Sequence, residues 1–182
     1  MEQRSTTNEP GAGQYEPKIV AFFCNWCTYT AADLAGVGRM RHAPNARVIR
    51  VMCSGRVDPQ FVLDAFAKGA DGVLIGGCHP GDCHYVEGNY KTLRRVAFLQ
   101  RLLEELGIEK DRLRLEWISA SEGDRVRTAV NAMTDRLREL GPLDLARRNA
   151  LLDREVAVHH EHPDMALHPA AQGQDKEVAA HA

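Results

Sequence analysis

The sequence predicts an α/β domain in which a small parallel β-sheet is flanked by helices. Between residues 17 and 141, four short apolar runs of strand length alternate with four longer segments of helical periodicity. The first run, KIVAFF at residues 18–23, is apolar after its first residue. Continuous runs of this kind are typical of parallel strands, because helices cover both of their faces.

Three further runs complete the predicted sheet. RVIRVM at residues 47–52 and GVLIGG at residues 72–77 are rich in β-branched and other apolar residues. LRLEWI at residues 113–118 alternates instead, which places Leu113, Leu115 and Trp117 on one face. This alternation predicts a strand at an edge of the sheet.

The first two predicted helices differ in how clearly their ends are marked. Residues 27–41 form a weak helical segment because Gly36 and Gly38 interrupt it. The second helix has a clear start, since Asp58 suits the N-cap and Pro59 suits the first helical position. The apolar face of the second helix is predicted to contain Phe61, Val62, Ala65 and Phe66.

The last two helices have recognisable boundaries. The third begins near Tyr90 and stops at Gly107. The fourth opens with a capping-box pattern from Ser119 to Glu122 and ends at Gly141-Pro142. Right-handed crossovers would join all four strands in one sheet, and we expect a small three-layer domain with the flavodoxin-like strand order 2-1-3-4.

The two ends of the chain differ in character from this domain. Residues 1–16 are polar and are predicted to be a flexible N-terminal lead, whereas residues 17–141 form the domain itself. In the C-terminal extension, residues 142–182, one more helix is predicted to about residue 158. The remainder is predicted to be disordered and carries five of the eight histidines.

Composition narrows the class of protein. A hydrophobic content of 44% with 26% charged residues is ordinary for a globular domain, and the net charge of -2 leaves no basic excess for nucleic acid. No apolar run is long enough to span a membrane, and the N-terminus lacks the apolar core of a signal peptide. We therefore expect a cytoplasmic protein. Because thiols are kept reduced in the cytoplasm, the five cysteines indicate metal or redox chemistry rather than structural disulfides.

The five cysteines follow the predicted strands. Cys24, Cys53 and Cys78 come directly after the first, second and third strands, Cys27 lies at the start of the first helix, and Cys83 follows Cys78 closely. Because parallel strands share one carboxyl edge, all five thiols are expected to converge there. Their loops contain glycine, which allows backbone N–H groups to approach a thiolate or sulfide.

Three chemistries suit such a group of thiols. A thioredoxin-like disulfide of Cys24 and Cys27 fits the turn from strand to helix but leaves three cysteines unused. A zinc site could use Cys24, Cys27, Cys78 and Cys83, or include His79 and His84. A 2Fe–2S cluster needs four thiolates, which two pairs from two loops would supply.

The iron–sulfur interpretation accounts for most of the cysteines. We predict that Cys24 pairs with Cys27 and Cys78 with Cys83, so that each pair binds one iron. Cys53 is then an alternative ligand or a thiol beside the cluster. His79 and His84 are expected to be loop residues or hydrogen-bond donors near the cluster.

Four segments carry a specific family resemblance. FFCNWCTYTAADLAG, VIRVMCSGRVDPQFVLDAF, GADGVLIGGCHPGDCHYVEGNYK and EWISASEG resemble the delta (iron–sulfur) subunit of methyl-viologen-reducing nickel–iron hydrogenase. The resemblance covers about residues 17–141 and implies one 2Fe–2S cluster, with all five family cysteines matched by Cys24, Cys27, Cys53, Cys78 and Cys83. The C-terminal extension lies outside it.

The resemblance also implies partners. It implies an electron-transfer subunit between a hydrogenase or formate dehydrogenase module and the flavin subunit of heterodisulfide reductase. No other catalytic constellation is present in the sequence, and the basic residues Arg56, Lys91, Arg94 and Arg95 near the cysteine loops are either solvated or dock an acidic partner. The remaining alternatives are a thiol–disulfide oxidoreductase and a zinc-stapled adaptor.

Overall fold

The computed structural model describes residues 15–145, 150 and 154. The chain divides into the units Met1–Leu143 and Asp144–Ala182, and the fold below is that of the first unit. The predictions of a flexible lead and of a disordered histidine-containing tail fall outside the described residues, apart from the last two positions of the lead. The predicted helix to about residue 158 also falls largely outside them.

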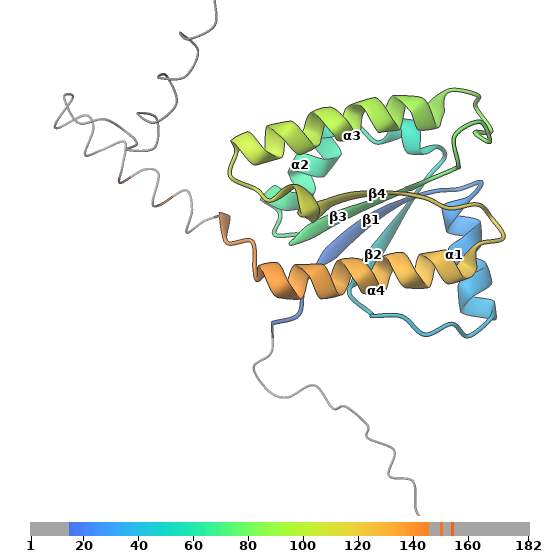
Figure 1. Cartoon of the computed structure of the whole chain (residues 1–182), viewed down its shortest axis with the longest axis horizontal. Coiled ribbons are helices and arrows are strands. Elements are labelled where there is room, and N and C mark those ends of the chain that lie inside the picture. The colour runs from blue at the N-terminus through green and yellow to red at the C-terminus, as the bar shows by residue number, and fades with distance from the viewer. Residues whose placement is uncertain (1–14, 146–149, 151–153, 155–182) are drawn as a thin grey trace, which may run out of the picture. The chain divides into compact units, whose positions relative to one another are not determined.

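Four parallel strands alternate with four helices, as predicted (Figure 1). The sheet has the order β2-β1-β3-β4, which confirms the expected order 2-1-3-4. The strands are β1 (Ile19–Cys24), β2 (Ala46–Val51), β3 (Gly72–Gly77) and β4 (Leu113–Trp117). The helices are α1 (Thr28–Val37), α2 (Pro59–Ala67), α3 (Gly88–Glu105) and α4 (Gly123–Leu140), with short 3-10 turns η1 (Ser54–Arg56) and η2 (Lys110–Arg112).

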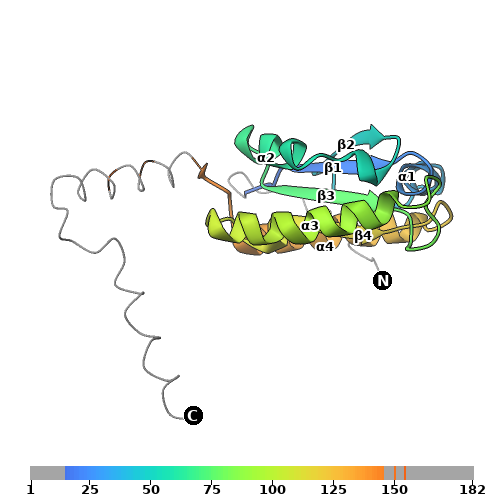
Figure 2. The ribbon, with the colours of Figure 1, turned by 90° about the horizontal axis from the view of Figure 1, so that it is seen from above.

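The helices form one layer on each face of the sheet. Figures 1 and 2 show α1 and α4 together on one face and α2 and α3 on the other, which gives the three-layer arrangement. On the α1/α4 face, buried side chains from alternate positions of β1 meet Met133 and Leu137 of α4. None of the described helices is long and apolar enough to cross a membrane.

The start of α1 lies very close to the carboxyl end of β3. A Cβ atom added at Gly76 would overlap the side chain of Thr28, and one added at Gly77 would lie 2.8 Å from the Trp117 ring. Both glycines are therefore required by close packing rather than by backbone conformation. This packing holds the segment that contains Cys27 against the strand that leads to Cys78.

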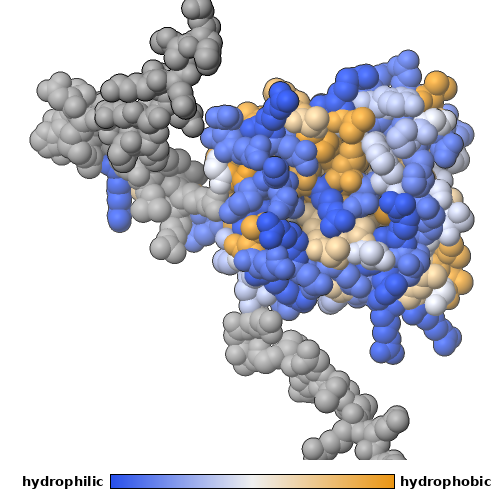
Figure 3. Space-filling view, in the orientation of Figure 1, coloured by the Kyte–Doolittle hydropathy of each residue, from blue (hydrophilic) through white to orange (hydrophobic). Residues whose placement is uncertain are grey.

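The two edge strands are covered to different degrees. The described side chains of β4 are buried or half-buried, and Figure 3, which views this side of the molecule, shows apolar side chains gathered on α3 among hydrophilic ones. In β2 the four central residues, Arg47 to Arg50, are all exposed. The apolar run at 47–52 is thus a strand that its own helices leave uncovered.

The helix boundaries confirm some capping predictions and correct others. The Asp58 carboxylate accepts the Gln60 N–H at 2.9 Å, with Pro59 in the first turn, as predicted. The first helix is shorter than predicted and ends at Val37, because Arg39 adopts a left-handed conformation with φ 52°. The fourth begins at Gly123 rather than at Ser119, although Glu122 does accept the Ser119 N–H at 2.7 Å.

Candidate metal centre

All five thiols are buried at the carboxyl edge of the sheet, as the sequence predicts. Cys24 is the last residue of β1, Cys27 precedes the first residue of α1, and Cys53 precedes η1 after β2. Cys78 follows β3, and Cys83 lies in the loop between β3 and α3. The segments that follow three strands therefore bring five soft ligands to one place.

Three of the thiols form a compact group. The sulfur atoms of Cys24, Cys27 and Cys78 all lie within 4.8 Å of one another, and those of Cys24 and Cys78 are 3.9 Å apart. The Cys24 sulfur also lies 3.8 Å from the carbonyl oxygen of Met52, which joins this group to the loop after β2. A cavity of about 280 Å³ opens onto Cys27 and Cys78.

The other two thiols form a separate pair. The sulfur atoms of Cys53 and Cys83 are 3.9 Å apart. Gly88, the first residue of α3, packs directly against both, since a Cβ atom added there would overlap the Cys53 sulfur and lie 3.1 Å from that of Cys83. A cavity of about 350 Å³, lined by Met52, Tyr85 and other residues, opens onto Cys53.

Backbone N–H groups surround the thiols, as the glycine-containing loops suggested. The Gly55 N–H donates to the Cys53 sulfur at 3.4 Å, although burial raises the pKa of this thiol overall. Burial alone would raise the pKa of Cys83, but the N–H groups of Tyr85, Asn89 and Gly88 and a hydrogen bond from the Cys53 thiol outweigh it, so the pKa of Cys83 is lowered. Oriented N–H groups of this kind stabilise negative charge on sulfur.

The three thiols of the compact group have pKa values that are shifted in opposite directions. Hydrogen bonds from the thiols of Cys27 and Cys78, assisted by backbone N–H groups, lower the pKa of Cys24 to about 2. The same contact with Cys24 raises the pKa of Cys27 to about 11 and also raises that of Cys78. Without a cation, one thiolate thus forms readily and the next two form with difficulty. A bound metal ion would remove this penalty, because it attracts every thiolate at once.

Polar contacts fix the loop that carries Cys78. The Asn89 side chain donates to the carbonyl oxygens of Cys78 and His79, at 3.3 and 2.8 Å. The His79 Nε2 atom lies 2.7 Å from a Glu122 carboxylate oxygen, which also accepts the Ser119 N–H. Hydrogen bonds from Ser119 and then His79 lower the pKa of Glu122 to about 2. His79 therefore anchors the loop to the start of α4.

Aromatic side chains join the two cysteine loops. The Trp26 ring, between Cys24 and Cys27, stacks on His84 with centroids 4.0 Å apart. Tyr85 meets His84 edge-on, and the Trp26 Nε1–H donates to the Tyr85 hydroxyl at 3.3 Å. Neither His84 nor His79 belongs to the compact thiol group. His79 contacts Glu122 and His84 packs in the aromatic group, and their role as loop residues or hydrogen-bond donors near a cluster stays a prediction.

The four basic residues singled out in the sequence divide into two kinds. The Arg95 guanidinium donates to the carbonyl oxygens of Gly55 and Val57, at 2.7 and 3.1 Å, so it fixes the loop after Cys53. Arg56 and Lys91 are exposed and line the cavity at Cys53, and Arg94 is exposed on α3. The sequence offered no signal that Arg95 supports the cysteine loop.

The geometry suits tetrahedral metal chemistry. Two thiolates bound to one tetrahedral ion at about 2.3 Å lie about 3.8 Å apart, close to the 3.9 Å of the Cys24/Cys78 and Cys53/Cys83 pairs. The sulfur of Cys78 lies beside Cys24 and that of Cys83 beside Cys53, whereas the sequence prediction paired Cys24 with Cys27 and Cys78 with Cys83. Which four thiols would ligate a cluster stays a prediction, and Cys53 is placed to be one of them because it forms a close pair with Cys83.

The fold and the thiols together define a class of protein, an α/β domain with a group of cysteines that could hold a metal at the carboxyl edge of a parallel sheet. Residues 19–141 match the family described as methyl-viologen-reducing hydrogenase, delta subunit. The chain belongs to this family.

Curated relatives agree with this assignment. The chain is 58% identical over 142 residues to the F420-non-reducing hydrogenase vhc iron-sulfur subunit of Methanococcus voltae, and the match covers 78% of this chain and 99% of that protein. It is 54% identical over 134 residues to the F420-non-reducing hydrogenase iron-sulfur subunit of Archaeoglobus profundus, covering 74% of this chain and 98% of that one. The resemblance seen in the sequence is thereby confirmed.

A third relative places the same domain in a larger chain. One subunit of the ferredoxin/F(420)H(2)-dependent CoB-CoM heterodisulfide reductase of Methanosarcina acetivorans is 50% identical over 127 residues. The match covers 70% of this chain but only 16% of that protein. The domain thus occurs both as a hydrogenase subunit and as one segment of a heterodisulfide reductase subunit.

Proposed function

We propose that the chain is an electron-transfer subunit that carries a 2Fe–2S cluster and does not itself catalyse a reaction. In this role it relays single electrons between a hydrogenase or formate dehydrogenase module and the flavin subunit of a heterodisulfide reductase-type complex. The observation that carries the proposal is the arrangement of five buried thiols at one sheet edge, with two pairs at 3.9 Å. A single disulfide would use only two of these thiols. Zinc and a 2Fe–2S cluster would each use four, and the iron-sulfur names of the relatives favour the cluster.

Four of the five cysteines would hold the cluster. The predicted ligands are Cys24, Cys27, Cys78 and Cys83, with Cys53 as the alternative ligand or neighbouring thiol. When bound, a 2Fe–2S cluster supplies a one-electron couple whose potential depends on hydrogen bonds to sulfur and on exposure to solvent. The chain's own contribution is to position the thiols, to donate backbone N–H hydrogen bonds to their sulfur atoms and to shield them from solvent.

The surroundings of the thiols suit a relay near the surface. The thiols are buried, yet Trp26 and Tyr85 beside them are about half exposed, at 43% and 49%. The two cavities at Cys27/Cys78 and at Cys53 open next to the sulfur atoms. A partner could therefore approach the thiols closely without entering the core of the domain.

The proposed partners rest on the relatives. The hydrogenase relatives carry the domain as a separate chain, and one heterodisulfide reductase relative carries it within its own longer sequence. A domain that is fused to one component in one organism and separate in another is expected to work against that component in both. This supports a position between hydrogenase and heterodisulfide reductase.

Reconstitution tests the relay. The full-length chain would be combined with a hydrogenase and a heterodisulfide reductase of the kinds named for its relatives, and hydrogen-dependent reduction of the heterodisulfide would be measured. We expect the rate to depend on the chain and to fall to background with Cys24→Ser/Cys78→Ser, because this pair loses two central thiols. An equal rate without the chain, or with the double variant, would overturn the relay.

A further inference from the structure

The free edge of β2 is the most unusual surface of the domain. A strand of a parallel sheet is normally covered on both faces, but Val48 and Ile49 are 44% and 47% exposed on opposite faces of β2. The Ile19 N–H, at the start of β1, donates to the Asn45 carbonyl oxygen. The N–H of Asn25, which follows the end of β1, donates to the Val51 carbonyl oxygen. By the alternation of backbone groups along a strand, the N–H and C=O groups of Val48 and Arg50 point to the open side.

The segment that contains this edge is rich in arginine. Residues 34–57 contain five arginines and no aspartate or glutamate. Within the part of the chain that the structure describes, none of the five forms an ion pair, whereas all the arginines of α4 do. Arg50 instead lies over the Tyr29 ring, 5.2 Å from its centroid. The five are Arg39, Arg41, Arg47, Arg50 and Arg56.

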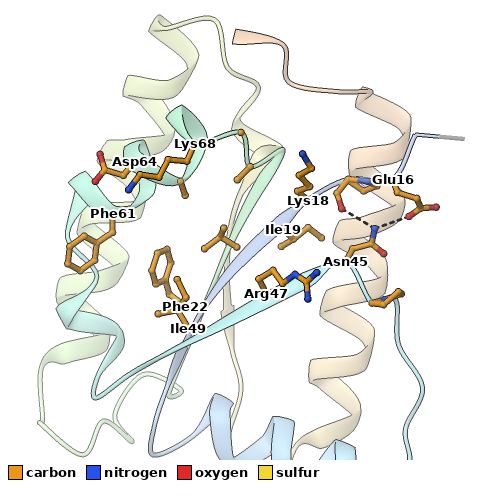
Figure 4. Close-up of a pocket in the computed structure, with 16 residues that line it drawn as sticks. Glu16, Lys18, Ile19, Phe22, Asn45, Arg47, Ile49, Phe61, Asp64 and Lys68 are labelled. Atoms are coloured by element: carbon orange, nitrogen blue, oxygen red, sulfur yellow. Dashed lines mark hydrogen bonds between the residues drawn. The ribbon is translucent and has the colours of Figure 1, made fainter. Parts of the chain in front are cut away.

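An apolar groove runs beside the arginines (Figure 4). The groove has a volume of about 670 Å³ and is lined by Phe61 of α2, Phe22 and Ile49, and the rings of Phe61 and Phe22 stack with centroids 6.3 Å apart. The predicted apolar face of α2 is thus only partly buried, since Phe61 remains 46% exposed. Charged residues around the groove are Lys18, Arg47 and Lys68, and two acids that are already engaged, Glu16 with Arg138 and Asp64 with Gln60.

The β2 edge leads directly to the thiols. The strand ends at Val51, and the next two residues are the exposed Met52 and the buried Cys53. Met52 and Arg56 also line the cavity that opens onto Cys53. A partner that lies along β2 would therefore reach the Cys53/Cys83 pair at the end of the strand.

We propose that the β2 edge, from Arg47 to Arg56 with the groove at Phe61, is a docking surface for an acidic protein segment that pairs with β2 as an added strand. The inference rests on the proposed function, since this partner is a protein with which the chain exchanges electrons. Added-strand binding uses the open backbone groups for affinity and side-chain pockets for specificity. Acidic side chains of the partner would meet the unpaired arginines, and an apolar one would fill the groove.

The same features favour protein over nucleic acid. Phosphate binding would use the arginines but would leave the apolar groove and the open strand edge without a role. The net charge of -2 also gives the chain no general attraction to nucleic acid. An acidic peptide segment uses all three features at once.

Charge reversal at the edge tests the surface. Binding to a purified hydrogenase and to a purified heterodisulfide reductase would be measured for the unaltered full chain and for two double variants. The glutamate variant is Arg47→Glu/Arg50→Glu, and the lysine variant is Arg47→Lys/Arg50→Lys. Arg101→Glu is the control, because Arg101 is also exposed and without an ion pair among the described residues but lies on α3. We expect the glutamate variant to bind one of the two partners at least about tenfold more weakly, since like charges at an interface repel. The lysine variant and the control should bind as the unaltered chain does.

Amide exchange tests the added strand itself. On binding, the N–H groups of Val48 and Arg50 should become protected, while those of α4 should not change. Unchanged binding of the glutamate variant, or no protection of these amides, would overturn the docking surface even if electron relay remained intact, which leaves the proposed function standing. Three other results would also overturn the docking surface. The first is that the chain forms a dimer and the glutamate variant is a monomer; the second is that the arginines bind an RNA oligomer while their substitution leaves binding to both protein partners unchanged. The third is that the chain binds neither partner. Only the last also counts against the relay.

Discussion

Single residues decide whether the thiols can sit where they do. Gly88 has no side chain, and this lets the first turn of α3 lie against the sulfur atoms of both Cys53 and Cys83. Gly55, in the loop after Cys53, packs so closely on the backbone of Gly88 that an added Cβ atom would lie 2.8 Å from its carbonyl oxygen. The pair of glycines thus closes the site from the side of α3, and neither has an unusual backbone conformation that would have revealed its role.

Substitution of Gly88 should disturb the site more than the fold. Gly88→Ala places a methyl group on the Cys53 sulfur, so we expect loss of bound metal and a loss of about 1–3 kcal/mol in the free energy of unfolding. The matched control is Gly36→Ala in α1, where an added Cβ meets nothing within 4 Å. That change should retain the metal and stabilise the helix by about 0.5–1 kcal/mol. Metal content and chemical unfolding of both variants would check this, and full metal content in Gly88→Ala would contradict the packing argument.

At the scale of elements, loops rather than strands hold the site together. The loop after β3 is tied to α3 by Asn89 and to α4 by the contact between His79 and Glu122. The loop after β2 is tied to α3 by Arg95, and the first cysteine loop is tied to the third by Trp26 and Tyr85. Each tie joins different segments of the chain, so the site depends on the assembled domain.

The contact between His79 and Glu122 should make stability depend on acid. Because the folded-state pKa of Glu122 is lowered from 4.5 to about 2, chiefly by the Ser119 N–H and then by His79, its contribution is present above pH 4.5. The contribution is lost as the pH falls toward 2, when the carboxylate becomes protonated in the folded state as well. Thermal unfolding of the metal-free chain and of Glu122→Gln would show this. The unaltered chain should unfold at a higher temperature at pH 6, and the two curves should converge toward pH 2. A constant difference across this range would show that the charge of Glu122 does not matter.

The sequence predicted the elements well and the details of their surfaces less well. The strand order 2-1-3-4 was an expectation by analogy with flavodoxin-like folds, and the structure confirms it. The meeting of the cysteines needs only parallel strands, because these share one carboxyl edge, so Cys24, Cys53 and Cys78 could be placed there in advance. The proximity of Cys83 to Cys53 could not, because it depends on the path of a loop and on the packing of Gly88. The exposure of β2 could not be predicted from the sequence either, since its apolar residues are those of a strand covered on both faces.

At the scale of the whole molecule, the features divide by position along the sheet. The carboxyl edge gathers all five thiols beside a partly exposed aromatic cluster, formed by Trp26, His84 and Tyr85. The β2 edge carries arginines that form no ion pair within the described residues, and the opposite edge is partly covered by α3 and α4. A relay needs both a site for electrons and a surface for a partner. In the proposed relay the two would lie next to each other, because Met52 and Cys53 line the same cavity.

The most direct test of the cluster is its composition. The full-length protein would be purified without oxygen, its iron, sulfide and zinc measured, and its electron paramagnetic resonance spectrum recorded after reduction with dithionite. We predict about two irons and two sulfides per chain and a rhombic signal from a single unpaired electron. Stoichiometric zinc, with no sulfide and no signal, would contradict the relay and would indicate a structural adaptor instead.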